Sequence, residues 1–73
     1  MDQQNLVKMA NQIGDFFESD PDQQQAAKEV ANHLKKFWES RMRKAIIGYI
    51  DQGGDGLKPI VFNAIQDNRQ MLS

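Results

Sequence analysis

The side chains that could do chemistry gather in one stretch, residues 31–43. It holds the only histidine, His33, and the only tryptophan, Trp38. It also holds most of a basic run made of Lys35, Lys36, Arg41, Arg43 and Lys44. A histidine can exchange a proton near neutral pH, and basic side chains beside aromatic ones can bind phosphates or an acidic partner. This stretch is therefore the first candidate for a functional surface.

Catalysis by His33 would need further groups. A catalytic base requires a reacting group and a concave site that excludes water. His33 falls at the edge of the apolar face of its predicted helix, where a histidine more often packs or donates a hydrogen bond. A chain of 73 residues rarely encloses a pocket. The carboxylates are spread over polar faces and form no pair. We therefore expect no catalytic residues.

Metal and nucleotide sites are also poorly supported. The chain has no cysteine and one histidine, so a transition-metal site would need carboxylates almost alone. Residues 53–56, Gly-Gly-Asp-Gly, precede a predicted helix, whose amides would favour an anion. They lack the spacing of a P-loop and its Lys-Ser/Thr end, and no strand precedes them. We interpret them as a helix end with a flexible link, and we expect no cofactor.

The charge pattern limits the classes of partner. A net charge of −1 gives no general attraction to nucleic acid, although a small DNA-binding regulator that reads DNA with residues 41–52 stays an alternative. No apolar run approaches the ~20 residues that cross a bilayer. The first residues are polar, with no basic region before an apolar core, so we expect no signal peptide. The expected location is the cytoplasm, without membrane or nucleic-acid contacts.

Apolar side chains recur at helical spacing in four segments, residues 4–18, 21–38, 41–52 and 59–70. The predicted buried faces are Leu6, Met9, Ala10, Ile13, Phe16 and Phe17; Ala27, Val30, Ala31, Leu34, Phe37 and Trp38; Met42, Ala45, Ile46, Tyr49 and Ile50; and Leu57, Ile60, Val61, Ala64 and Ile65, with Met71 and Leu72. Residues prone to form strands occur only inside these segments. The sequence predicts one all-α domain over residues 1–73, a small bundle or compact array of three to four short amphipathic helices.

Residue types at the segment ends predict where the helices begin and end. Asp20 is a good N-cap for the second helix, with Pro21 as its first residue. Ser40 can cap the third helix, and Gly53 is the expected stop at its end. Lys58 stands where a small capping residue is expected before the fourth helix.

Some apolar residues fall outside the predicted buried faces, among them Val7, Ile47 and Phe62. Arginine and large apolar groups are favoured at the centres of protein interfaces. We therefore predict a partner-binding surface made of Trp38, Arg41, Arg43, Ile47 and Phe62. Trp38 also matches the phase of Leu34 and Ala31, so for this residue we favour a place in the core over contact with a partner.

Three blocks of sequence support a family assignment. They are Met9-Ala10-Asn11-Gln12-Ile13 with Phe16-Phe17; His33-Leu34-x-x-Phe37-Trp38-x-x-Arg41-Met42-Arg43; and Gly53-Gly54-x-Gly56-Leu57-x-Pro59-x-Val61. Together they closely resemble the delta subunit of soluble NAD-dependent formate dehydrogenases, over about residues 7–65. The middle block is the most specific. Lys58 departs from the pattern, and the tail after Asp67 adds nothing to the resemblance.

The resemblance implies a small non-catalytic subunit of a cytoplasmic molybdenum- or tungsten-containing complex that oxidises formate and reduces NAD. The implied partners are the large catalytic subunit and the other subunits, which carry the pterin cofactor, the iron–sulfur clusters, the flavin and the NAD site. The implied role is assembly or stabilisation, with no cofactor bound to the small subunit. Self-association of the isolated chain and another kind of protein-binding adaptor are alternatives.

Overall fold

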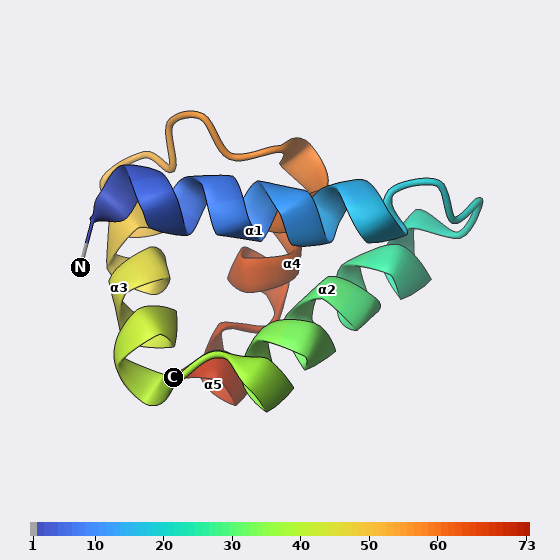
Figure 1. The fold of residues 1–73 in the computed structure, drawn as a ribbon. Helices are drawn as coiled ribbons and strands as arrows, with labels where there is room; N and C mark the ends of the chain where they lie inside the picture. Colours follow the sequence, from blue (N-terminus) through green and yellow to red (C-terminus); the bar gives the residue numbers. More distant parts are fainter. Residues whose placement is uncertain (1) are drawn as a thin grey trace.

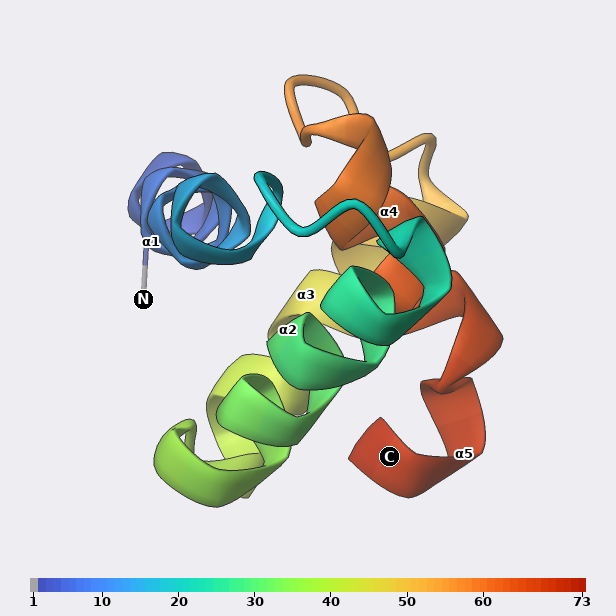
Figure 2. The ribbon, with the colours of Figure 1, turned by 90° about the vertical axis from the view of Figure 1, so that its right-hand side faces the viewer.

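The computed structural model describes residues 2–73, which form five α-helices and no strand (Figure 1). The helices are α1 (Gln3–Phe17), α2 (Gln23–Phe37), α3 (Ser40–Asp51), α4 (Pro59–Asp67) and α5 (Arg69–Leu72). In Figure 1, α1, α2 and α3 form three sides of a triangle, and α4 lies behind it. Figure 2 shows α1 end-on at the left, with α4 and α5 towards the right of the view. The predicted all-α array is confirmed.

The start of α2 differs from the prediction. The Asp22 carboxylate is the N-cap and accepts hydrogen bonds from the amides of Gln24 and Gln25, at 3.1 and 3.2 Å. The Asp20 carboxylate accepts instead from the Asp22 amide, at 2.9 Å. The prediction of Asp20 as the cap and Pro21 as the first helical residue is therefore wrong. Of two aspartates two residues apart, the second satisfies two free amides of the helix and the first shapes the turn before it.

The ends of α3 confirm one prediction and correct another. Ser40 is the first helical residue and not its cap, and the N-cap position belongs to Glu39, whose side chain makes no capping hydrogen bond. At the other end, Gly53 donates its amide to the Ile50 carbonyl (2.9 Å), and the Gly54 amide donates to the Tyr49 carbonyl (3.0 Å). These two bonds form a Schellman motif, with Gly53 at a φ of 120°. The predicted stop at Gly53 is confirmed.

The fourth predicted helix is interrupted. α4 ends at Asp67, and Asn68 adopts a non-helical φ of −117° while its side-chain amide donates to the Ala64 carbonyl at 2.8 Å. The chain then resumes as α5. This break turns Leu72 into the core, where it is almost fully buried. An asparagine that bonds the last turn of its own helix competes with continuation of that helix.

One core collects side chains from all five helices. Its largest fully buried members are Val30, Leu34, Ile46, Val61, Ile65 and Leu72. The α4 helix packs against α1, α2 and α3. At Gly14 the approach to α4 is so close that an added Cβ would lie 2.6 Å from Cγ2 of Val61.

Two aromatic residues predicted in the core are exposed. Phe16 is 77% exposed and Phe37 is 69% exposed. The line of α1 that meets the core is Leu6, Ala10 and Gly14, and Phe16 lies about 200° around the helix from Gly14. Phe37 is the last residue of α2, and the Trp38 that follows it takes the buried position. Their predicted burial is wrong for these reasons.

The apolar residues predicted to lie off the core face are partly buried. Val7, Ile47 and Phe62 all pack against the core. Ile47 is on α3, which contacts α1, α4 and α5, so more than one side of that helix is covered. Phe62 is covered by the loop after α3, because its ring lies so close to Gly54 that a Cβ there would be 2.7 Å from it. These three residues fall outside the predicted buried faces, yet each is only partly exposed.

The glycine-rich loop is tied to the helices around it. The side-chain amide of Asn11 donates to the Gly56 carbonyl and its oxygen accepts from the Lys58 amide, both at 2.9 Å. The Tyr49 hydroxyl donates to the Asp55 carbonyl. The sequence predicts a flexible link here, but in the structure hydrogen bonds attach this loop to α1 and α3.

None of the helices in residues 2–73 has the length and apolar character needed to cross a bilayer.

Candidate functional site: an apolar groove beside a basic corner

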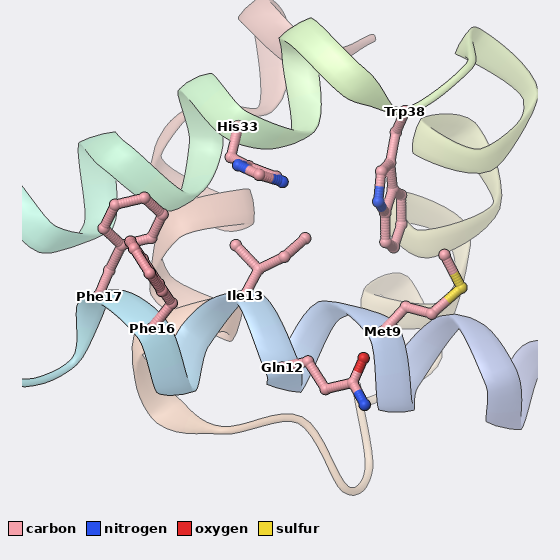
Figure 3. A pocket seen from close by; sticks show the side chains of 7 residues that line it. All are labelled: Met9, Gln12, Ile13, Phe16, Phe17, His33 and Trp38. Carbon is pink, nitrogen blue, oxygen red and sulfur yellow. The ribbon is translucent and has the colours of Figure 1, made fainter.

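An apolar groove opens between α1 and the end of α2 (Figure 3). Its volume is about 400 Å³. It is lined by Met9, Gln12, Ile13, Phe16 and Phe17 of α1, by His33 of α2, and by Trp38. Two polar side chains, Gln12 and His33, are among these seven. The groove therefore offers mainly apolar contact, with little capacity for hydrogen bonding.

The groove exists because α1 and α2 diverge from a short turn, residues 18–22. The side-chain amide of Gln23 fixes this turn by donating to the carbonyls of Glu18 and Asp20, at 3.1 and 2.7 Å. Phe16 and Phe17 lie at the turn end of the groove (Figure 3). At the other end the indole of Trp38 reaches across from the end of α2 towards α1, near Met9.

Aromatic rings form a chain across the two helices. Phe16 and Phe17 meet edge to face, with centroids 4.9 Å apart. The His33 ring lies 6.3 Å from Phe17 and 4.7 Å from Phe37. Because Phe16 and Phe37 are both largely exposed, this small domain presents two large aromatic groups to its surroundings. Exposed aromatic side chains beside an apolar hollow are typical of a protein-binding surface.

Helical periodicity does not predict this surface, although the sequence contains a signal for it. At the ends of α1 and α2 the chain carries two adjacent aromatic residues, Phe16-Phe17 and Phe37-Trp38. Neighbours on a helix point about 100° apart, so both members of a pair do not face the middle of one buried stripe. The first member of each pair is the exposed one.

His33 is partly buried among aromatic rings, between Phe17 and Phe37. This placement agrees with the interpretation of a packing histidine at the edge of the apolar face. Within residues 2–73, no group of three His, Cys, Asp or Glu side chains is arranged to hold a metal ion.

A basic corner joins α2 to α3 at the Trp38 end of the groove. We define it as Lys35, Lys36, Arg41 and Lys44, all of which are exposed. Among the ion pairs of residues 2–73, none involves these four side chains. Their charges are therefore available to a partner.

Arg43 belongs to the same basic run but is used inside the chain. Its guanidinium donates to the carbonyls of Lys35 (3.1 Å) and Trp38 (3.0 Å) at the end of α2, and to that of Leu72 (3.1 Å) in α5. The residue pattern predicts that Arg43 is part of a partner-binding surface. The carbonyls that it contacts are those of its own chain.

The five predicted partner-binding residues thus occupy different environments. Trp38 is 6% exposed and forms one end of the groove, and Arg41 is exposed at the start of α3. Arg43, Ile47 and Phe62 are partly buried. The structure brings Trp38 and Arg41 to one corner, whereas Ile47 and Phe62 do not line the groove. A role for these residues in binding stays a prediction.

Comparison with known proteins supplies the identity of the chain. The family model for the NADH-dependent formate dehydrogenase delta subunit, FdsD, matches residues 5–65. Neither the curated proteins nor the solved structures give a significant match. The matched range covers most of α1, all of α2 and α3, and most of α4, including the groove and the basic corner. The chain therefore belongs to the family of NADH-dependent formate dehydrogenase delta subunits.

Proposed function

We propose that this chain is a non-catalytic accessory subunit of a cytoplasmic NAD-dependent formate dehydrogenase and that it supports assembly or stability of the holoenzyme. The observation that carries the proposal is the family match over residues 5–65. In this proposal the large catalytic subunit and its companions oxidise formate and hold the pterin, iron–sulfur, flavin and NAD sites. The small subunit contributes contacts alone.

The surface chemistry supports a docking role. The groove and the exposed Phe16 and Phe37 offer apolar contact area, and the basic corner offers charges that have no partner within residues 2–73. Apolar centres with charged rims are the usual composition of protein interfaces. We propose that Trp38 and Arg41 touch the partner directly.

The other three predicted residues, Arg43, Ile47 and Phe62, then affect binding indirectly, by holding the docking surface in shape. Arg43 holds the corner in shape through its three carbonyl contacts. Ile47 and Phe62 set the packing of α3 and α4 on the core. Substitutions at these positions would alter docking through the shape of the subunit.

Two measurements test the accessory role. The tagged chain is purified from its native cytoplasm, and the eluate is assayed for formate-dependent reduction of NAD. The other subunits are also produced with and without this chain, and the half-life of that activity is compared. We expect a large iron–sulfur polypeptide and the activity to copurify with the chain, and the activity to decay faster in its absence.

The opposite results would identify another function. If neither the polypeptide nor the activity is retained and the complex is equally stable without the chain, the accessory role is wrong. Retention of DNA, with a gel shift that weakens as salt is raised, would favour the DNA-binding regulator, because phosphate contacts release counterions.

A further inference from the structure

The dimensions of the groove suit a short helix. On α1 its lining runs from Met9 to Phe17. The rise of a helix from the first to the last of these residues is about 12 Å, a little more than two helical turns. An amphipathic helix laid along this length would present three or four apolar side chains, at positions i, i+3 or i+4, and i+7. These side chains would fill the hollow between the Phe16 end and the Trp38 end.

The chemistry of the walls favours a helix over an extended segment. Both walls are helical, so most of their backbone amides and carbonyls are already paired and cannot form a ladder with an added strand. The polar side chains in the lining are Gln12 and His33. An extended segment would therefore bury unpaired backbone groups in apolar surroundings, which is costly. A helix satisfies these groups internally.

The charged side chains at the two ends of the groove indicate which charge the bound helix carries at each end. At the Trp38 end, the basic corner presents Lys35, Lys36, Arg41 and Lys44 without ion pairs among residues 2–73. At the turn end, the carboxylates of Asp20 and Asp22 accept bonds from backbone amides, and Glu18 pairs with Lys58. Asp20 and Asp22 have no ion pair among residues 2–73, so the turn end keeps their negative charges. The Trp38 end carries the four cations of the basic corner and the exposed carboxylate of Glu39, and its net charge is therefore positive.

We propose that the groove receives an amphipathic helix of a larger subunit of the same complex, with apolar side chains along one face and acidic side chains at the end that reaches the basic corner. This inference rests on the proposed function and names the kind of segment that the subunit binds. The exposed rings of Phe16 and Phe37 pack on its apolar face. The acidic end provides specificity and speeds association.

Photo-crosslinking in the assembled complex tests the occupant. A benzophenone-bearing phenylalanine derivative replaces Phe16, Phe37 or, as a control, Asn63, an exposed residue of α4 that does not line the groove. Crosslinked peptides are identified by mass spectrometry. We expect the Phe16 position, which lines the groove, and the Phe37 position, whose ring lies beside His33 of the groove, to capture one segment of a larger subunit, with helical apolar spacing and acidic residues at one end. We expect the Asn63 position not to capture it.

Affinity measurements test the contacts. The double variant Phe16→Ala/Phe37→Ala removes two exposed side chains, so we expect an unchanged melting temperature and at least a tenfold loss of affinity for complex prepared without this chain. The variant Lys36→Glu/Arg41→Glu is expected to weaken binding and to reduce its dependence on salt. Lys28→Glu is the matched charge control, because Lys28 lies on another side of α2, beside Asp67 and Asn68.

Several outcomes would overturn the inference. Crosslinks to a second copy of this chain, to a segment without helical apolar spacing, or to no segment would each do so. Wild-type affinity in the double phenylalanine variant would also contradict it. These failures differ from failure of the proposed function: there, the unmodified chain does not associate with the formate-oxidising complex at all.

Discussion

Two arginines two residues apart serve different purposes, because their surroundings differ. The guanidinium of Arg43 reaches the carbonyls of Lys35 in α2, of Trp38 directly after it, and of Leu72 in α5, whereas Arg41 is exposed. The carbonyls at a helix end have no partner within the helix, and a cation there also complements the helix dipole. Arg43 therefore joins the end of α2 to the end of the chain.

The variant Arg43→Met keeps an apolar stem and removes these bonds. We expect it to lower the free energy of unfolding by about 2 kcal/mol, given the usual value of hydrogen bonds to charged groups and the partial exposure of the site. That corresponds to a fall of about 10 °C in melting temperature for a domain of this size. Thermal unfolding followed by circular dichroism measures it.

Arg41→Met is the matched control for this prediction. It removes the same group from an exposed position, so we expect a change within about 0.5 kcal/mol. Equal stability of the two variants would mean that the carbonyl contacts of Arg43 contribute nothing to the fold. A loss of binding to the complex in Arg41→Met alone, at unchanged stability, would support direct contact by that residue.

At the scale of elements, the contact between α1 and α4 depends on a missing side chain. A Cβ at Gly14 would lie 2.6 Å from Cγ2 of Val61 and 3.4 Å from Cγ2 of Ile60. At Gly48 in α3 a Cβ would meet nothing within 4 Å. Both glycines are inside helices, where alanine is intrinsically favoured by about 1 kcal/mol. The two sites therefore separate helix propensity from packing.

We expect Gly14→Ala and Gly48→Ala to change stability in opposite directions. Gly14→Ala forces α1 and α4 apart and should cost about 1–3 kcal/mol, more than the gain in helix propensity. Gly48→Ala should stabilise the chain by up to about 1 kcal/mol. Urea unfolding of both variants gives the values. A stabilising Gly14→Ala would mean that the two helices can separate without cost.

Helices were predictable from the sequence because apolar spacing along each segment reflects one shared core. Their ends were less so, since Asp20 and Asp22 are equally good caps and only the folded turn decides between them. The break at Asn68 depends on a bond to Ala64 that competes with a regular helix. Ile47 and Phe62 are partly buried because neighbouring elements cover them, among them α5 and the glycine-rich loop. The helical spacing of one segment carries no information about such neighbours.

The candidate site was predictable in part. Trp38 and Arg41 were selected because of their residue types, and both lie at the corner that borders the groove. The groove itself follows from the divergence of α1 and α2, which is a tertiary property. Helical periodicity assigned Phe16 to a buried face, because it does not show which part of a wide apolar stripe meets another helix.

At the scale of the whole molecule, a chain of 73 residues has little stability to spare. Contacts between distant parts of the chain therefore matter. The loop before α4 is held on α1 by Asn11 and by Lys58, whose ammonium lies 2.7 Å from Oδ1 of Asp15 and 3.2 Å from Oε2 of Glu18. Lys58 departs from the expected small capping residue, and its side chain serves this connection.

The pH dependence of stability follows from this cluster. Hydrogen bonds from the ammonium to Asp15, and then to Glu18, raise the pKa of Lys58 above its ordinary value of 10.5. The folded chain thus holds this proton more tightly than the unfolded chain. The stabilisation is fully present below the ordinary pKa and is lost as the pH rises through the raised pKa. The site is open to solvent, so salt screening makes the effect modest.

Comparison of variants isolates this contribution, because the wild type and Lys58→Met differ in no other ionisable group. We expect Lys58→Met to be less stable than the wild type at about pH 9, and the difference to shrink as the pH rises through the raised pKa of Lys58. Urea unfolding at about pH 9 and at a strongly alkaline pH measures it. Lys28→Met, which removes a lysine without an ion pair in residues 2–73, should show no such convergence. If the Lys58→Met difference were the same at both pH values, the alkyl stem of Lys58, and not its charge, would hold the loop on α1.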